Sequence, residues 1–402
     1  MKDKKIGIIG AGLTGLIAAK ELSKKGFDVT IIEKLEVPGG RIRSEKIDGW
    51  ILDVGFQVIL TAYPYLKKHV NYEKLDLVNL DAGTNVYGNN LKTVVGDPTR
   101  VKSVFWKTLF SPVGSIKDKF LIFKLKLKVD KLSNDEIFKL KDRSSYEYLK
   151  AFGFSEKIIN NFFKPFFSGI FLENKLETSS KMLLFVFKMF SQGNAAIPKN
   201  GMKQLGQVVA DSIEGVTIKY NTTVKKVEGS KIILENHEVL NFDFIVNTIP
   251  SNDVAWHNSD CFYFEHKSPR LIKNQRIGLI ANNNQLINNI FYPSSINKPD
   301  NKDGKELLSV TVVDNQNLRC EELKNRVIKE MKEVLGLNTL KFIKHYSIPK
   351  SLPNLKSPSY QIKFHQSGNC LNVGDYLSNG SQNAACKTGE DVAEFIFMHF
   401  SK

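Results

Sequence analysis

Two short apolar runs near the start of the chain enclose a glycine-rich turn and an amphipathic segment. Residues 5–9 and 28–33 are rich in isoleucine and valine, which predicts two strands buried on both faces. Between them, residues 14–25 place apolar side chains at helical spacing, and Gly26 follows as a natural helix stop. The pattern therefore predicts a strand–helix–strand unit with glycines on its first turn.

The three glycines of that turn have the spacing of a pyrophosphate-binding loop. Gly10 allows a tight turn, Gly12 lets the main chain approach a phosphate, and Gly15 lets the helix pack close to the strand. The helix N-terminus then offers free N–H groups to an anion. Glu33, at the end of the second strand, would accept hydrogen bonds from the hydroxyls of an adenosine ribose. The alternative, a glycine-rich turn without a ligand, is disfavoured by the complete set of features.

Two further motifs lie far apart in the sequence. Gly39-Gly40-Arg41 forms a second close-approach loop, whose guanidinium suits a phosphate or an acidic edge. Near the end of the chain, residues 371–373 predict a strand, Gly374-Asp375 follow it, and a helix is expected from about Ser381. Nicotinamide enzymes do not need the second loop, so the pair of motifs favours a flavin nucleotide.

Together, GAGLTGL, Glu33, GGR and the closing GD resemble the flavin-binding motifs of the amine oxidase, protoporphyrinogen oxidase and phytoene desaturase superfamily. Residues 53–64, 162–172, 177–202 and 346–355 resemble an uncharacterised subgroup of NAD(P)/FAD-dependent oxidoreductases within it. The resemblance implies FAD as cofactor, with the GGR loop along the pyrophosphate and the last helix pointing at the flavin. The cofactor-binding residues it implies are Gly10, Gly12, Leu13, Thr14, Gly15, Glu33, Lys34, Gly39, Gly40, Arg41, Gly55, Phe56, Gln57, Val224, Thr248, Pro250, Gly374, Asp375, Ser381, Gln382 and Asn383.

The expected fold class is α/β, with a Rossmann-like FAD-binding domain and a discontinuous α+β substrate domain. Residues 1–80, 200–252 and 345–402 are assigned to the FAD-binding domain, and residues 81–199 and 253–344 to the substrate domain. Helical patterns dominate residues 85–195, short strands fill residues 215–250, and a helix is expected over residues 320–335.

The chain of 402 residues is 42% hydrophobic, enough for a large core, and carries a net charge of +15. Much of that charge lies in residues 102–131, where Lys124, Lys126 and Lys128 alternate with apolar residues like a strand, although the preceding stretch has helical spacing. A solvated face is favoured over weak peripheral contact with an anionic membrane, and no nucleic-acid motif accompanies the charge.

The start of the chain lacks a signal-peptide pattern and no apolar run reaches transmembrane length, so a cytoplasmic protein is expected, with peripheral membrane contact left open. The four cysteines show no metal spacing and are expected to be reduced thiols. A covalent flavin link through Cys386 is disfavoured, because Cys386 falls within the last helix.

The catalytic residues are not defined by the sequence. Gln57 and Tyr376 are candidates for contact with the flavin or substrate, although Gln57 could equally bond the backbone. His257 and His365 are read as satisfied or solvated side chains, and no nucleophile–base pattern is recognised. A cluster of phenylalanines is assigned to core packing in preference to an apolar substrate tunnel; its members are Phe162, Phe163, Phe166, Phe167, Phe171, Phe185, Phe187 and Phe190.

The sequence therefore predicts an FAD-dependent oxidoreductase that removes a hydride from a C–H or C–N bond. The substrate is expected to be largely apolar, such as an amine, a tetrapyrrole or an isoprenoid, with O₂ or a quinone-like molecule as electron acceptor. A redox-neutral flavin-dependent isomerase or mutase is one alternative. A non-enzymatic carrier of lipidated proteins, related to Rab escort proteins, is the other. The oligomeric state is left open.

Overall fold

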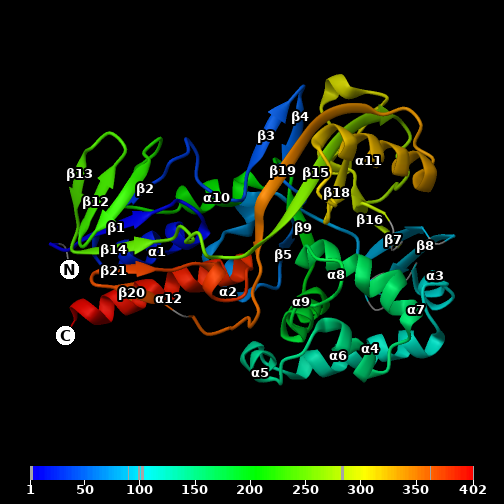
Figure 1. Cartoon of the computed structure of the whole chain (residues 1–402), viewed down its shortest axis with the longest axis horizontal. Helices are drawn as coiled ribbons and strands as arrows, with labels where there is room; N and C mark the ends of the chain where they lie inside the picture. Colours follow the sequence, from blue (N-terminus) through cyan, green and yellow to red (C-terminus); the bar gives the residue numbers. More distant parts are fainter. Residues whose placement is uncertain are drawn as a thin grey trace.

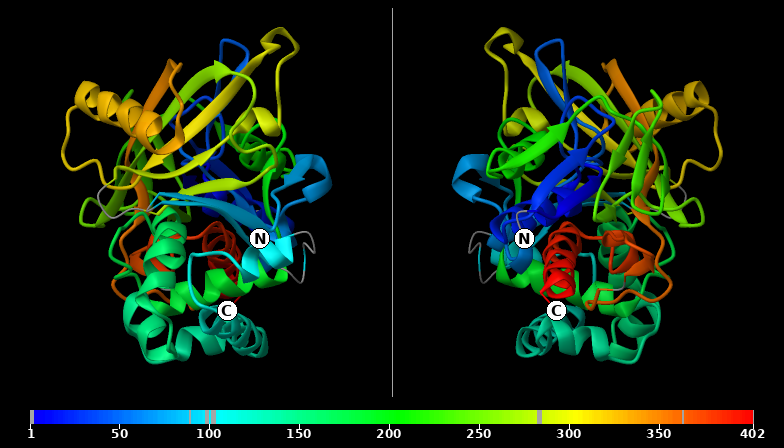
Figure 2. Two further views of the ribbon diagram at one scale, coloured as in Figure 1. Left: turned by 90° about the vertical axis from the view of Figure 1, so that its right-hand side faces the viewer. Right: turned by 90° about the vertical axis from the view of Figure 1, so that its left-hand side faces the viewer.

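The computed structural model describes residues 3–88, 90–97, 100, 104–281, 285–362 and 364–401. Three groups of elements make up the molecule: a mostly parallel sheet near both chain ends, a large mixed sheet, and a group of helices beneath the mixed sheet (Figure 1). The side views show the C-terminal helix beside the first elements of the chain (Figure 2).

A six-stranded sheet contains the predicted strand–helix–strand unit. Its strand order is β10-β2-β1-β14-β21-β20, and every neighbouring pair is parallel except β20 and β21. The strands are β1 (Lys5–Ile9), β2 (Asp28–Ile32), β10 (Val216–Lys219), β14 (Phe244–Asn247), β20 (His365–Ser367) and β21 (Cys370–Asn372).

Both faces of this sheet are covered, as the apolar runs predict. Ile8 packs into the core that contains α1 (Leu13–Lys24), while Ile9 packs against β12 on the other face. The helices α1 and α12 (Gln382–Phe400) lie against each other, and a Cβ on Gly389 would stand 2.6 Å from the carbonyl oxygen of Thr14. The last helix is therefore fixed tightly beside the first.

Three small sheets connect the larger parts. An antiparallel sheet comprises β11 (Val224–Glu228), β12 (Lys231–Leu234) and β13 (Val239–Asn241). A hairpin comprises β3 (Ser44–Ile47) and β4 (Trp50–Asp53), and a further sheet has the order β5 (Ile59–Leu60), β9 (Ala195–Pro198), β6 (Leu77–Asn79). The helices α2 (Pro64–His69) and α10 (Lys203–Ala210) flank this region.

The seven-stranded sheet has the order β19-β15-β18-β17-β16-β7-β8, and only β16 and β7 pair in parallel. Its strands are β7 (Gly83–Gly88), β8 (Leu91–Gly96), β15 (Trp256–Lys267), β16 (Ile277–Ile280), β17 (Ile287–Phe291), β18 (Lys305–Val312) and β19 (Lys341–Pro353). The helix α11 (Cys320–Leu335) covers one face through Leu323, Val327 and Met331.

The helical group begins after β8. It comprises α3 (Phe105–Leu109), α4 (Ile116–Lys131), α5 (Asn134–Lys139), α6 (Ser145–Phe152), α7 (Glu156–Ile158), a π-turn (Ile159–Phe163), α8 (Lys164–Phe171) and α9 (Ser180–Gln192). Serines begin three of these helices in reciprocal capping boxes, Ser115 with Asp118, Ser133 with Glu136, and Ser144 with Glu147. Single-turn 3₁₀ segments lie at Tyr72–Leu75, Pro293–Ser295, Asp300–Lys302 and Asp375–Leu377.

The α/β fold class and several predicted elements are confirmed, including β1 and α11 with the expected bounds. The alternating block of lysines is helical, because Leu121, Leu125 and Val129 bury one face of α4 at helical spacing. The expectation that helices dominate residues 85–195 is wrong for its first part, where β7 and β8 extend the large sheet.

The domain division remains a prediction. The expected boundary at residue 345 falls inside β19, and that whole strand pairs with β15 in the seven-stranded sheet. We therefore propose that the last FAD-binding segment begins after β19.

Candidate functional site

One cavity of about 1440 Å³ runs between the six-stranded sheet, the helical group and the seven-stranded sheet. Its walls come from segments throughout the chain, from Ile9 to Ala385. Because a site for one drug-sized ligand has a volume of roughly 300–1000 Å³, this cavity can hold a large cofactor and a substrate together.

The glycine turn between β1 and α1 forms one end of the cavity. Gly10 has a φ of +98°, a backbone conformation that side chains disfavour, and its N–H bonds the carbonyl of Ile32 at 2.8 Å. A Cβ on Gly15 would stand 2.0 Å from the carbonyl oxygen of Gly10, so this position requires glycine for close packing. A Cβ on Gly12 would meet no atom within 4 Å, so space is open above this residue.

Glu33 is held rigidly beside that turn. Its carboxylate accepts hydrogen bonds from the N–H of Ala11 at 2.6 Å and from the N–H of Leu35 at 2.9 Å. The residue is buried and also lines the cavity. Because a carboxylate has about four acceptor positions, the remaining ones can bind hydroxyl groups of a ligand.

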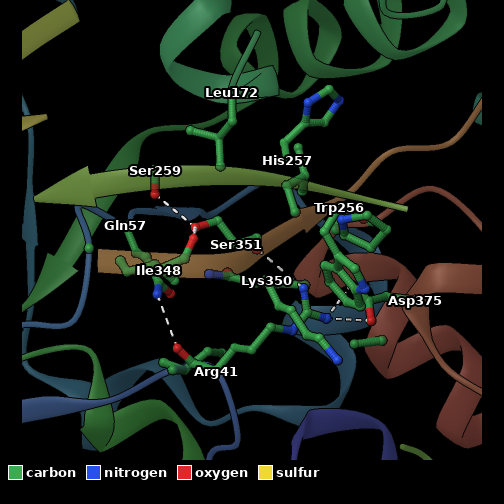
Figure 3. A pocket seen from close by; sticks show the side chains of 18 of the residues that line it. Arg41, Gln57, Leu172, Trp256, His257, Ser259, Ile348, Lys350, Ser351 and Asp375 are labelled. Atoms are coloured by element: carbon green, nitrogen blue, oxygen red, sulfur yellow. Dashed lines mark hydrogen bonds and ion pairs between the residues drawn. The ribbon is translucent and has the colours of Figure 1, made fainter. Parts of the chain in front are cut away.

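The second loop and the closing motif meet at the middle of the cavity. Gly39 has a φ of +119°, and its N–H bonds the carbonyl of Ala11 at 2.8 Å, which joins the two glycine loops. The guanidinium of Arg41 reaches the carboxylate of Asp375, with Nη2 2.5 Å and 2.6 Å from the two oxygens (Figure 3). The ring of Trp256 lies 5.3 Å from this guanidinium.

The N-terminal turn of α12 lines the cavity through Ser381, Gln382 and Ala385. Ser381 caps the helix by accepting a hydrogen bond from the N–H of Ala384 at 3.0 Å. Gln382 donates to the carbonyl of Val58 at 3.3 Å, while its Oε1 is buried without a partner. A helix N-terminus of this kind stabilises negative charge.

These features fit a flavin dinucleotide. The open space at Gly12 suits a pyrophosphate beside bare main chain, and Glu33 suits a ribose. Four cavity-lining residues carry buried polar atoms without hydrogen-bond partners among the described residues: Trp256 Nε1, Asn289 Oδ1, Thr311 Oγ1 and Gln382 Oε1. Buried polar groups are normally paired, so such atoms indicate a place for a bound molecule.

The predicted cofactor residues come together as a group, since all of them line the cavity except Gly15 and Asn383. Gly15 lies behind the turn, where the absence of a side chain allows α1 to pack against the backbone of Gly10. Asn383 is fully buried and accepts a hydrogen bond from the N–H of Tyr65 at 2.9 Å, so it faces α2 and not the cavity.

Of the two candidate catalytic residues, the structure places only Gln57 on the cavity wall. Its amide donates weakly to the carbonyls of Arg41 at 3.3 Å and Val54 at 3.4 Å, the backbone contact named as the alternative. Tyr376 does not line the cavity, and its contact with the flavin or substrate stays a prediction. The 3₁₀ turn folds its ring back over Gly374, where a Cβ would stand 2.4 Å from the ring, and Tyr376 is buried away from the cavity.

Sequence patterns do not indicate that β15 and β19 contribute to the site, and His257 is expected from the sequence only as a satisfied or solvated side chain. Trp256, His257 and Ser259 come from β15, and Lys350 and Ser351 come from β19 (Figure 3). The hydroxyls of Ser259 and Ser351 are 2.7 Å apart. Residues 346–355 carried the family resemblance, but only the pairing of two strands far apart in sequence brings them to the cavity.

His257 has the clearest electrostatic signature of these residues. Burial lowers the pKa of its imidazole below the usual value, and the charge of Glu173 opposes this shift more weakly. The ring is therefore neutral at pH 7 and can accept a proton. His365, by contrast, is exposed on β20.

The members of the phenylalanine cluster lie partly in the core and partly along the cavity wall. Phe163, Phe167 and Phe185 are almost fully buried core residues. Phe166, Phe171 and Phe190 line the cavity. Other largely apolar side chains that line the cavity are those of Leu60, Tyr63, Ile170, Leu172, Met182, Val186, Ile277 and Leu279.

Comparison with known proteins places this site in a family. Residues 13–351 match the family described as flavin containing amine oxidoreductase. The chain belongs to this family. FAD is its cofactor, and the family is one of flavin-containing oxidoreductases.

Individual curated relatives match a smaller part of this chain than the family does. Coproporphyrinogen III oxidase of Staphylococcus aureus is 25% identical over 61% of this chain and 60% of its own length. The zeta-carotene-forming phytoene desaturase of Myxococcus xanthus is 42% identical over 15% of this chain and 11% of its own length. The chain thus matches less than two thirds of the length of these curated relatives. An oxidoreductase from Methanosarcina mazei superposes with a TM-score of 0.71 at 19% identity, covering 97% of this chain and all of the other, which shows a shared fold.

Other site types find less support in the described residues. Among them, no group of three or more acidic, histidine or cysteine side chains is arranged to hold a metal ion. The helices of this part of the chain include none with the length and apolarity to cross a bilayer. Cys386 is fully buried in α12 and does not line the cavity.

Proposed function

We propose that the protein removes a hydride from a C–H or C–N bond of a largely apolar substrate bound beside FAD. The observation that carries this proposal is one continuous cavity that is lined both by the nucleotide-binding motifs and by aromatic and aliphatic side chains. A hydride acceptor and an apolar chamber that excludes water are the two requirements of such a reaction.

We propose that the cofactor is held along the predicted motifs. Glu33 binds the adenosine ribose, and the loops at Gly12 and Gly40 lie along the diphosphate. Gln57 and Gln382 lie further along the cavity wall, where Gln382 Oε1 offers an unpaired acceptor. The bound flavin supplies the hydride acceptor, and the chain supplies orientation, charge and the exclusion of water.

The substrate end orients its ligand through a few polar groups on an apolar wall. Asn289 Oδ1 and Thr311 Oγ1 are buried acceptors without partners among the described residues, and both residues line the cavity. His257, with its neutral imidazole, can take a proton from a substrate nitrogen or carbon as the hydride departs.

We infer a large, flat or extended substrate. The size of the cavity and the aromatic side chains Phe166, Phe171 and Phe190 support this inference. The names of the two relatives, an oxidase of a porphyrinogen and a desaturase that forms a carotene, point in the same direction. A tetrapyrrole or an isoprenoid polyene is therefore proposed ahead of a small amine, with O₂ or a quinone-like molecule as the acceptor.

Anaerobic reduction of the purified flavoprotein tests the proposal. Panels of porphyrinogens, carotenoid precursors and amines are added, and the flavin absorbance is followed. Bleaching by a porphyrinogen or a polyene precursor is the expected result, and bleaching only by amines would overturn the proposed substrate class. A substrate converted by reduced enzyme without a change in mass would show the redox-neutral alternative to be correct.

We also propose that the helices α3 and α4 rest on an anionic membrane surface. The buried face of α4 carries Leu121, Leu125 and Val129, yet its outer face is also apolar. Ile116, Phe120, Phe123 and Leu127 are 48–66% exposed and recur at helical spacing. On α3, Trp106 and Phe110 are 64% and 69% exposed, and their rings stack on each other with centroids 5.9 Å apart.

Ile116, Phe120, Phe123 and Leu127 form an apolar stripe on α4, and the lysines beside it indicate that its partner is an anionic surface. Lys117, Lys124, Lys128 and Lys131 are exposed along the neighbouring row of α4, which complements anionic lipid headgroups. Residues 102–103 of the predicted basic block lie outside the described residues. A membrane that presents an apolar substrate to the cavity would also suit the proposed reaction.

A further inference from the structure

Cys320, His345 and Asp260 form a hydrogen-bonded chain outside the cavity. The sulfur of Cys320 lies 3.1 Å from Nδ1 of His345, and Nε2 of His345 lies 2.7 Å from Oδ1 of Asp260. Cys320 is the first residue of α11, whereas His345 and Asp260 come from β19 and β15. None of the three lines the cavity described above.

The imidazole in this chain is fixed in position. Asp260 is 3% exposed, and its second carboxylate oxygen accepts a hydrogen bond from Nδ2 of Asn315 at 3.0 Å. The ring of Phe262 stacks on the His345 ring, with centroids 4.1 Å apart and planes 4° apart. Because Asp260 accepts the Nε2 proton, Nδ1 is the bare nitrogen and can receive the thiol proton.

The order of these groups is that of an activated nucleophile, a base and an orienting acid. The N-terminus of the 16-residue helix α11 and a protonated His345 both stabilise negative charge on sulfur. Glu321 and Glu322 on the same turn oppose this effect, although Glu321 pairs with Lys324 at 2.6 Å. The sulfur and the carboxylate bond opposite ring nitrogens, so they do not converge as ligands of one metal ion.

We propose that Cys320 is a peroxide-reactive thiol, with His345 as its base. Its exposure at the protein surface suits attack on a small electrophile. His345 takes the thiol proton, and the sulfur attacks one oxygen of hydrogen peroxide while the O–O bond breaks. The proton from His345 then joins the departing hydroxide. The sulfur is oxidised by two electrons to a sulfenic acid, and the peroxide is reduced to water.

Added hydrogen peroxide makes the test independent of the flavin reaction. The full-length, FAD-loaded protein is treated with peroxide, and sulfenic acid is trapped with a dimedone probe and located by peptide mass spectrometry. The remaining cysteines are buried and serve as internal controls, since Cys261, Cys370 and Cys386 are only 1%, 8% and 0% exposed. We expect labelling at Cys320, and labelling about tenfold or more slower in His345→Gln.

A second variant provides a matched exposed thiol. Lys329 lies on the same helix with a side chain 72% exposed, so Cys320→Ser/Lys329→Cys carries a surface thiol without a histidine base. We expect this thiol to react about tenfold or more slowly than Cys320. Equal rates for the two thiols would overturn the proposal, even if His345→Gln fails to fold. An unchanged rate in a folded His345→Gln protein would also overturn it.

Discussion

The guanidinium of Arg41 and the carboxylate of Asp375 form an ion pair across the cavity, although they are 334 residues apart in sequence. Nη2 of Arg41 reaches both carboxylate oxygens, and its Nη1 lies 3.4 Å from the carbonyl of Ser351. The pair thus joins the second glycine loop, the closing motif and β19. It also neutralises an acidic group that would otherwise face the proposed diphosphate.

This pairing predicts unequal effects of the two obvious substitutions on FAD affinity. Asp375→Asn keeps the cation but replaces the charged partner that orients the guanidinium of Arg41, so a loss in FAD affinity of only about tenfold is expected. Arg41→Ala removes the cation and leaves the carboxylate of Asp375 unpaired, for which a loss of roughly 100-fold or more is expected. The double variant should bind FAD more tightly than Arg41→Ala alone. Fluorescence titration of the apoprotein measures all three, and purely additive losses would contradict the coupling.

Gly12 provides a test of the cofactor position that leaves the fold intact. Its φ of −73° is ordinary, and a Cβ there would meet no protein atom within 4 Å. Gly12→Ala is therefore expected to keep the thermal stability of the apoprotein while weakening FAD binding by about tenfold or more, because the methyl group occupies the space proposed for the pyrophosphate.

Gly15→Ala is the matched control for that variant. Its new Cβ would stand 2.0 Å from the carbonyl oxygen of Gly10, so the apoprotein itself should be destabilised. Calorimetry of both apoproteins, together with FAD titration, separates the two effects. Normal FAD affinity in Gly12→Ala would show that the diphosphate lies elsewhere.

The sequence predicts those parts of the site whose residues lie close together along the chain, because local spacing determines how they are arranged. Gly10, Gly12 and Glu33 lie within one strand–helix–strand unit, where spacing alone determines their geometry. The helix α11 is similarly defined by its own periodicity and by Gly336 at its C-terminus.

The contacts that the sequence does not predict depend on the pairing of strands that are far apart along the chain. His257 reaches the cavity, and His345 reaches Asp260, only because β15 and β19 pair along their length within the large sheet. No spacing in the sequence marks these contacts. The orientation of the Tyr376 side chain is also not predictable, since the direction of a side chain after Gly374 depends on a short 3₁₀ turn that the sequence does not specify.

Asp53 is expected to make stability depend on pH. Its carboxylate accepts hydrogen bonds from Ser44 Oγ at 2.5 Å and from the N–H of Met202 at 2.9 Å, yet burial raises its pKa from 3.8 to about 6. The folded state therefore binds the proton more tightly than the unfolded state. Between pH 4 and pH 6 the free energy of unfolding should fall as pH rises, by at most about 3 kcal/mol.

Asp53→Asn keeps an acceptor oxygen but cannot titrate. Urea unfolding at a series of pH values should show a flatter dependence between pH 4 and pH 6 than in the wild-type protein. Asp303→Asn, at an exposed position, serves as the control and should follow the wild-type curve. Parallel curves for Asp53→Asn and the wild type would show that Asp53 is ionised normally.

His257 is predicted to assist the reductive step without holding the cofactor. His257→Gln should slow anaerobic flavin reduction by about tenfold or more, because the amide cannot accept a proton. FAD affinity should be unchanged. Since burial lowers the pKa of His257, the wild-type rate should fall only on the acid side, below the usual histidine value, and this fall should be absent from the variant. His365→Gln, on exposed β20, is the control, and equal rates for the two variants would remove the role of His257.

The apolar stripe on α4 predicts binding to anionic vesicles. Insertion of Phe120 and Phe123 buries side chains that are 66% and 48% exposed, and each buried aromatic contributes roughly 1.5–3 kcal/mol. Phe120→Glu/Phe123→Glu should therefore abolish cosedimentation with phosphatidylglycerol vesicles. Lys117→Glu/Lys124→Glu should weaken it by about tenfold or more, since each basic residue near the surface adds about 1 kcal/mol.

Two controls distinguish specific binding of vesicles through α4 from nonspecific association of the protein with lipid. Val239→Glu changes a side chain that is 47% exposed on β13, in the sheet that covers the nucleotide-binding strands, and should leave vesicle binding unchanged. Phosphatidylcholine vesicles should bind the wild-type protein much less than anionic ones, and added salt should reduce the anionic binding, because the lysine row acts through screened charge. If the Phe120/Phe123 variant bound as the wild type does, the outer face of α4 would be a solvated surface, which is the alternative that the sequence favours.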